Sequence, residues 1–362
     1  MKTMTDRERF IRTMTYQPVD RRPLYVVGIW PDTLKRWRKE GLPETVDVHQ
    51  YLGLQVMRSL YVGPRMGLWP PFEEKIIEER DNYRISIDGY GRKVKTFLDH
   101  TSMPEWLEFP VKNASDLERI IEEHFVLETM DLRFGEDWEK RIAEASRTDA
   151  VRVLDGGCYY WTLRSLAGVE VTSYLLYDAA PVVEKLFQRY LTVVLEGIKR
   201  TCSRIQVDCL GFGEDIAYKT GPLISPQMFR QLILPCYQEA VNLARSYGVN
   251  LTWFDSDGNL RNLLPDLLSA GINTFAPCEV AAGMDPVELR ARWGRQVRMI
   301  GGIDKREVAR GKKSIDALLE RCLPLIREGG FIPAIDHSVS ADISFENYCY
   351  FLQKLEKFLL MV

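Results

Sequence analysis

Acidic residues end five consecutive apolar segments in the second half of the chain, and carboxylates so placed could move protons or hold a cation. They are, in chain order, Glu214 with Asp215, Asp255 with Asp257, Glu279, Asp304, and Asp336 with His337. Asp, Ser and Gly also favour turns and helix starts, so the stretch WFDSDGN at 253–259 has an ordinary structural explanation when taken alone. A shared position at the ends of strands would instead bring these acids together.

Carboxylates that gather around one pocket repel one another unless a cation, a proton or a basic group neutralises them. Lys219 and Lys305 lie nearby in the sequence and could neutralise part of this charge. Several carboxylates with one imidazole also suit a divalent metal of intermediate hardness, and zinc accepts Asp, Glu and His ligands. The residue types therefore favour either acid–base chemistry or a zinc-like site without thiolates.

The elements that must position these acids alternate regularly from residue 150 onward. Apolar strand-like segments at 150–157, 207–215, 249–258, 272–280, 296–304 and 330–337 are separated by helical patterns. Such alternation predicts a parallel sheet. A strand at 23–29, and a further one near 55–62 or in the region that follows, would make eight strands. We therefore expect a (β/α)8 barrel, an α/β fold whose strand ends share one mouth; a doubly wound open sheet is the alternative.

The first part of the chain predicts an N-terminal elaboration of this barrel with helices and a β-hairpin. A short helix is expected at 5–15, and a hairpin at 83–97 around Asp88-Gly89. Residues 61–112 are rich in Gly, Pro and aromatics and are interpreted as an inserted flap. We expect one barrel domain that spans residues 1–362.

Composition excludes several classes of partner. The 362 residues carry a formal net charge of −3 with no dense Lys/Arg stripe, which argues against nucleic acid. No apolar stretch approaches the roughly 20 residues of a membrane span, and no secretory leader is recognised. Seven scattered cysteines without a CxxC pair argue against disulfides and a thiolate zinc cage. A cytoplasmic protein is expected, for which a homodimer is one option.

Aromatic residues recur near the predicted strand ends. The stretch GGCYYW at 156–161 directly follows one strand, and other rings lie near turns at Trp30, Trp69, Phe72, Trp253 and Phe254. Core packing is the ordinary explanation for each ring. As a group they would suit an apolar or aromatic substrate pocket.

The segments from GEDIAYKTGPLISPQMF to GGFIPAIDH resemble the uroporphyrinogen decarboxylase superfamily. GPLISPQMF, LLPDLLSAGIN, AAGMDPVELRARWG and GGID are specific as a set, and the resemblance extends over most of the chain. It implies a (β/α)8 barrel. True uroporphyrinogen decarboxylases hold a polycarboxylate with arginines after the first strand, but Gly28 and Asp32 stand at those positions here. Decarboxylation of that substrate is therefore not expected.

The other branch of the superfamily resembles corrinoid-linked methyltransferases, many of which bind zinc through His-x-Cys-Gly and a later Cys. Here DSDG places Asp255 at the His and Asp257 at the first Cys, and the later Cys falls at about Ile335. The related cobalamin-independent methionine synthases add a glutamate, and Glu279 is similarly placed. The resemblance thus implies a metal or acid site with changed ligands.

The function implied is transfer of a methyl group from a small donor, a methoxylated aromatic or a similar O- or N-methyl compound, to the cobalt of a separate corrinoid protein. Oxygen-linked donors suit the harder ligand set. The candidate metal ligands are Asp257, Glu279, His337 and Asp336, with zinc the favoured metal; the candidate catalytic residues are Glu214, Asp215, Lys219 and Asp255. The alternatives are a decarboxylase acting on a smaller acid and a non-enzymatic binder.

Overall fold

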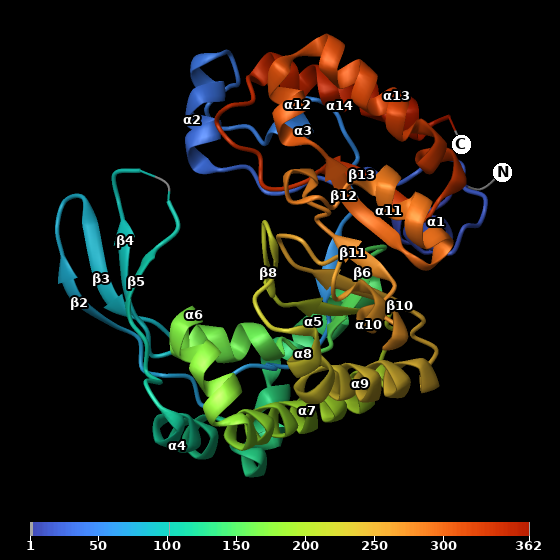
Figure 1. The fold of residues 1–362 in the computed structure, drawn as a ribbon. Helices are drawn as coiled ribbons and strands as arrows, with labels where there is room; N and C mark the ends of the chain where they lie inside the picture. The colour runs from blue at the N-terminus through green and yellow to red at the C-terminus, as the bar shows by residue number, and fades with distance from the viewer. Residues whose placement is uncertain (1–2, 101, 362) are drawn as a thin grey trace.

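A curled parallel sheet forms the centre of the computed structural model, which describes residues 3–100 and 102–361 (Figure 1). Seven strands follow the order β1-β6-β7-β10-β11-β12-β13, and every pairing is parallel. Their bounds are β1 (Ser59–Tyr61), β6 (Val151–Asp155), β7 (Cys209–Gly213), β10 (Leu251–Asp255), β11 (Thr274–Ala276), β12 (Arg298–Ile303) and β13 (Phe331–Ile335). The six strands predicted from residue 150 onward are confirmed, as is the strand near 55–62.

The predicted strand at 23–29 is not formed as a regular strand. The segment is extended, but it meets its neighbours at separate points: Met57 N–H donates to Leu24 O at 2.7 Å, and Val339 N–H donates to Gly28 O at 2.8 Å. Isolated contacts of this kind do not make a strand ladder. The architecture is thus an α/β fold with a curled seven-stranded sheet, in which this segment lies between the β1 side and the loop after β13.

The inner face of the sheet has an apolar core of its own, because alternate side chains of each strand point inward. Helix α1 (Asp6–Met14), predicted at 5–15, supplies Phe10 and Met14 to this core. Its members are Phe10, Met14, Met57, Val151, Val153, Cys209, Leu251, Ala276, Ile300 and Ile332. These side chains fill the sheet toward the N-terminal ends of its strands.

Helices cover the outer face and bury a second, larger apolar core. They are α6 (Tyr159–Asp178), α7 (Ala180–Cys202), α8 (Pro226–Leu232), α9 (Leu234–Ser246), α10 (Leu264–Ser269), α11 (Pro286–Trp293), α12 (Lys305–Arg310), α13 (Lys312–Glu328) and α14 (Phe345–Leu359), with single turns at Val280–Ala282 and Gly294–Gln296. Pro235 lies at the start of α9, just after the break from α8, and Ser225 caps α8. No helix in the described part of the chain has the length and hydropathy needed to cross a membrane.

The first part of the chain adds helices and a separate sheet, which Figure 1 shows standing at the left of the curled sheet. The hairpin predicted at 83–97 is confirmed as the central pair of a four-stranded antiparallel sheet. The elements are α2 (Pro31–Lys39), α3 (Val48–Tyr51), β2 (Lys75–Glu79), β3 (Tyr83–Ile87), β4 (Lys93–Phe97), β5 (Glu105–Glu108), α4 (Ala114–His124), the 3-10 helix Leu127–Phe134 and α5 (Glu136–Arg147). A further two-stranded hairpin joins β8 (Ala217–Tyr218) to β9 (Gly221–Pro222).

Candidate functional site

A cavity of about 340 Å³ opens on the inner face of the sheet, toward the C-terminal ends of β7 and β10. It is lined by Tyr25, Ser59, Tyr61, Val153, Gly211, Phe212, Gly213, Trp253 and Asp255. Its volume is at the small end of the range for ligand pockets, so it suits a small molecule. The C-terminal ends of the strands are also where enzymes with curled parallel sheets of this kind carry their chemistry.

Two glycines of β7 create this space. The strand register places Gly211 opposite Trp253 and Gly213 opposite Asp255. Both glycines share the inward face with Cys209, which packs in the inner core, so the space above that core is left open. A Cβ atom at Gly211 would lie 2.9 Å from Val153 Cγ1, which is too close for an ordinary contact. Because neither glycine has a side chain, the inward face of β7 leaves the space that forms the pocket.

Asp255 is the acid that faces the cavity. It is the last residue of β10, and its side chain lines the cavity. The pKa of Asp255 is raised to about 7, chiefly by burial and also by the negative charges of Asp257 and Asp215, while a hydrogen bond from Trp253 and the charge of His337 act in the opposite sense. At neutral pH this carboxyl group is therefore divided between its protonated and ionised forms.

Asp257 and His337 form an ion pair, with His337 Nε2 3.3 Å from Asp257 Oδ2. The two residues follow β10 and β13, which are separated in the sheet by β11 and β12. The hydrogen bond to Asp257 raises the pKa of His337 above its usual range. The structure thus brings together two of the predicted metal ligands from strands that are not neighbours.

Asp336 and Glu279 connect the loops that follow the strands. Asp336 is fully buried, and its two oxygens accept hydrogen bonds from Val280 N at 2.9 Å and Lys305 N at 3.1 Å. Burial raises the pKa of Asp336 to about 6. Glu279 Oε2 accepts a hydrogen bond from Gly258 N at 3.3 Å. Both carboxylates therefore hold the loops that frame the mouth.

Glu214 is buried on the outer side of the sheet, against α6, with 1% of its surface exposed. Its carboxylate accepts hydrogen bonds from Tyr159 N at 2.7 Å, Trp161 N at 2.9 Å and the Tyr237 hydroxyl at 2.5 Å. Burial raises the pKa of Glu214 to about 7. The first two donors lie in the first turn of α6, whose backbone N–H groups have no partner within the helix. Glu214 thus positions α6 from the end of β7.

Asp215 and Lys219 lie at the edge of the site. Arg164 Nη2 pairs with Asp215 Oδ2 at 3.2 Å, and the backbone of Asp215 has a positive φ of 42°. This pair ties α6 to the loop after β7. Lys219 is exposed in the turn between β8 and β9. Neither residue lines the cavity, and their predicted catalytic roles stay predictions.

The predicted metal ligands do not form a complete ligand set. Across residues 3–100 and 102–361, no three His, Cys, Asp or Glu side chains lie close enough together to hold a metal ion. Both oxygens of Asp336 are already used by backbone N–H groups, and His337 is paired with Asp257. The residues as arranged therefore do not fit a resident zinc ion. The ion pair and the acid of the cavity are instead suited to moving or holding a proton.

Two residues of the site were missed from the sequence. Asp155 ends β6 on the inward face, and its pKa is raised to about 6, chiefly by burial. Tyr61 of β1 lines the cavity, and the pKa of its hydroxyl is raised, chiefly by burial and further by Asp155 and Asp255. The signal for Asp155 was present in VLDGG, an acid at a strand end, but Asp155 is not among the residues predicted for the site. Nothing in the sequence around Tyr61 indicated its place.

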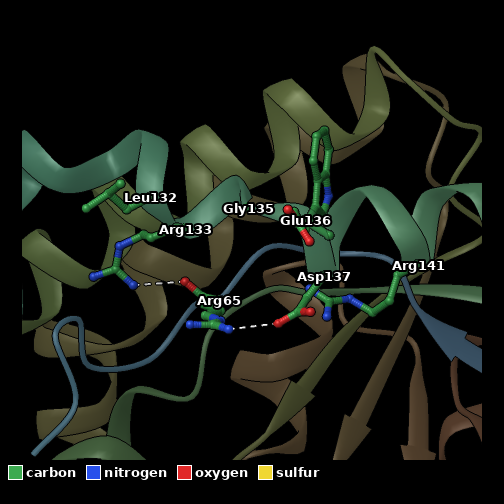
Figure 2. A pocket seen from close by; sticks show the side chains of 8 residues that line it. Arg65, Leu132, Arg133, Gly135, Glu136, Asp137 and Arg141 are labelled. Atoms are coloured by element: carbon green, nitrogen blue, oxygen red, sulfur yellow. Dashed lines mark hydrogen bonds and ion pairs between the residues drawn. The ribbon is translucent and has the colours of Figure 1, made fainter.

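A second cavity, of about 240 Å³, lies apart from these acids between the 3-10 helix and α5 (Figure 2). Its cations already have partners. Arg65 Nη2 pairs with Asp137 Oδ2 at 2.8 Å, and Arg133 donates to the carbonyl oxygens of Arg65 and Gly67 at 2.9 and 2.7 Å. None of the predicted site residues lines it. We therefore place the site at the cavity inside the sheet.

Comparison with solved structures supports the fold. A "methyltransferase from Methanosarcina mazei" aligns over 98% of this chain and 99% of that chain, with a TM-score of 0.59 and 16% sequence identity. A putative vitamin-B12 independent methionine synthase from Listeria monocytogenes aligns over 94% of this chain and 97% of that chain, with a TM-score of 0.39 and 10% identity, which is too low to support any conclusion. No curated protein sequence matches the chain significantly.

The family is given by the sequence from α6 to α14. Residues 161–358, more than half of the 362 positions, match the family described as uroporphyrinogen decarboxylase (URO-D). The match begins at the helix that Glu214 positions and includes the strand ends that carry Asp255, Asp257 and His337. The chain therefore belongs to the uroporphyrinogen decarboxylase (URO-D) family.

Proposed function

We propose that this protein transfers a methyl group from a small donor, an O-methyl or N-methyl compound, to the cobalt of a corrinoid carried by a separate protein. The observation that carries the proposal is the cavity, in which Asp255 faces Tyr25, Tyr61 and Trp253 at the C-terminal ends of the strands. The structural neighbour called a methyltransferase, together with the family resemblance to corrinoid-linked enzymes, supports this branch of the family over decarboxylation.

The size of the cavity supports a separate corrinoid carrier. A cavity of about 340 Å³ has room for a small donor but not for a corrin macrocycle. The corrinoid would therefore approach from outside, over the C-terminal ends of the strands, and when bound it would supply reduced cobalt as the nucleophile. The residues of this chain would hold the donor, exclude water from it and stabilise its leaving group.

Asp255 could assist the reaction of either kind of donor, the O-methyl compound or the N-methyl cation. For an O-methyl donor, the oxygen must be protonated as its bond to the methyl carbon breaks, and an acid whose pKa is near the working pH is suited to this step. The pKa of about 7 meets that condition. For an N-methyl cation, the ionised form of Asp255 would instead neutralise the charge of the donor. The ion pair of Asp257 and His337 lies beside Asp255 and would help to fix its protonation state.

The lining of the cavity argues against the decarboxylase alternative. Substrates with carboxylates are usually held by arginine, which binds them through two parallel hydrogen bonds. Among the described residues that line the cavity there is no Arg, Lys or His, and the single charged group is Asp255. A small acid would meet a carboxylate with no compensating cation.

Product analysis tests the proposal. Purified protein would be incubated anaerobically with reduced cobalamin and with methoxyaromatic or methylated-amine donors that carry an isotopic label in the methyl group. We expect the label to appear on cobalamin and the demethylated donor to accumulate in equal amount. Release of carbon dioxide from small carboxylic acids, without any transfer of label, would support the decarboxylase instead.

A further inference from the structure

Three of the four aromatic residues that line the cavity, Tyr25, Tyr61 and Trp253, come from three separate elements and surround one space. Tyr25 belongs to the extended segment at 23–29, Tyr61 to β1 and Trp253 to β10. The rings of Tyr25 and Trp253 meet edge to face, with centroids 5.7 Å apart and an interplanar angle of 71°. Tyr61 is 61% exposed although it lies on the inner side of the sheet, so its ring is open to the cavity.

In the described part of the chain, no Arg or Lys side chain lies over the rings of Tyr25, Tyr61 and Trp253. Arg or Lys side chains lie over many other rings. Examples are Arg65 over Trp69 at 4.9 Å, Arg164 over Trp161 at 4.7 Å and Arg295 over Tyr16 at 5.0 Å. The electron-rich faces in the cavity are therefore free to bind a cation from outside the chain.

The charges around the cavity have one sign. Asp255 lines it at the end of β10, and Asp155 ends β6, on the other side of β7, on the same inner face. Among the described lining residues there is no cationic side chain, and the nearest imidazole, that of His337, is already paired with Asp257. A negative, aromatic pocket of small volume has the features with which proteins recognise methylated ammonium ions.

We propose, on the basis of the methyl transfer suggested above, that the methyl donor is a small quaternary or tertiary methylammonium ion. Its methyl groups lie against Tyr25, Tyr61 and Trp253, and its positive charge faces Asp255. The donor proposed here is therefore an N-methyl cation, whereas the sequence favoured O-methyl compounds.

The chemistry of such a donor balances without a proton from the protein. The bond between nitrogen and the methyl carbon breaks, nitrogen keeps the electron pair, and the methyl group passes to the cobalt, whose reduced form supplies the new pair. For a quaternary donor the product is a neutral tertiary amine.

A binding experiment with a matched pair of ligands tests this inference without any methyl transfer. Calorimetry on the full-length protein would compare choline with its neutral carbon isostere, in which a carbon atom replaces the nitrogen. We expect choline to bind at least about tenfold more tightly, because only the cation gains from the rings and the carboxylate. Equal affinities, or no saturable binding of choline and tetramethylammonium at millimolar concentrations, would overturn the inference.

Variants show whether binding occurs in this cavity. Tyr61→Leu and Asp255→Asn should each weaken choline binding at least about fivefold. Tyr174→Leu is the matched control, because Tyr174 is 60% exposed on α6 and does not line the cavity. Unchanged binding in both cavity variants would overturn the inference.

The outcomes also separate this inference from the proposed function. Demethylation of a methoxyaromatic by a protein that binds no cation would leave the methyltransferase proposal standing and refute the cationic donor. Binding of choline by a protein that transfers a methyl group to cobalamin from none of the methylammonium or methoxyaromatic donors would support the cation site and refute the methyltransferase proposal.

Discussion

His337 Nε2 lies 3.3 Å from Asp257 Oδ2 and so joins the ends of two strands that are not neighbours in the sheet. The pair stands beside Asp255, the one charged residue that lines the cavity among the described residues. It brings one of the later carboxylates to the imidazole at one end of the sheet. It does not by itself make a metal site.

The ion pair predicts the titration of His337. Because Asp257 stabilises the imidazolium, the pKa of His337 should lie above its usual value of about 6.5. The stabilisation is fully present below the unfolded pKa and is lost as the pH rises through the folded pKa. Both groups are partly exposed, so it should amount to less than about 1 kcal/mol.

Nuclear magnetic resonance can follow this titration because the chain has only four histidines. Asp257→Asn should lower the pKa of His337 toward its usual value, and the other three histidines serve as internal controls. An unchanged pKa of His337 in that variant would contradict the pairing.

The two inward glycines of β7 predict different effects of the same substitution. Gly211→Ala places a Cβ atom 2.9 Å from Val153 Cγ1 and should destabilise the protein by about 1–3 kcal/mol. A Cβ atom at Gly213 would meet nothing closer than Cys158 Sγ at 3.8 Å, so Gly213→Ala should fold normally while it narrows the cavity. Urea denaturation and ligand binding distinguish the two effects. Normal stability of Gly211→Ala would show that the strand is not packed as described.

Glu214 predicts a large loss of stability when it is truncated. Glu214→Ala would leave Tyr159 N–H, Trp161 N–H and the Tyr237 hydroxyl without their acceptor, at a cost of about 3 kcal/mol or more. Glu214→Gln retains one acceptor oxygen and should cost less. If both variants unfold at the urea concentration of the wild type, Glu214 does not position α6.

Glu214 also predicts a pH dependence of stability. Its folded-state pKa is raised from 4.5 to about 7, so its protonated form is favoured by folding. The stability linked to this proton is fully present below about pH 4.5 and is lost as the pH rises through about 7, on the order of 3 kcal/mol. Unfolding free energies of the wild type and Glu214→Gln, measured from acid to neutral pH, should diverge by this amount. Parallel curves would contradict the raised pKa.

The zinc predicted from the sequence has its own test. Metal analysis of the purified protein would give a ratio near one metal ion per chain if Asp257, Glu279 and His337 hold zinc, and His337→Ala would lower it. The arrangement described above leads us to expect no stoichiometric metal, since no complete ligand set is preassembled in the described residues. Stoichiometric zinc that disappears in His337→Ala would show that these side chains rearrange around the ion.

The sequence predicted the repeating part of the fold well, because strand–helix alternation leaves a clear apolar pattern. It missed α6, whose start CYYW was interpreted as pocket aromatics. Tyr159 and Tyr160 are in fact fully buried, and Gly168 interrupts the helix with a φ of 71°. A helix that is apolar on most sides shows no 3.6-residue period. Its position was therefore hidden from pattern analysis.

The site was harder to predict than the fold because inward and outward positions alternate along a strand. Glu214 and Asp255 both end strands, but the register places Gly213 opposite Asp255, so Glu214 falls outside the cavity. The sequence alone does not give this register. For the same reason Asp155, which faces inward, was passed over.

The most direct test of the account is the absorption spectrum of reduced cobalamin mixed anaerobically with the protein and a methyl donor. Methylammonium donors should convert cob(I)alamin to methylcob(III)alamin in step with demethylation, and Asp255→Asn should slow this conversion at least about tenfold. The proposed methyl transfer would be contradicted if folded protein, or protein that binds choline, gave no conversion with any methylammonium or methoxyaromatic donor.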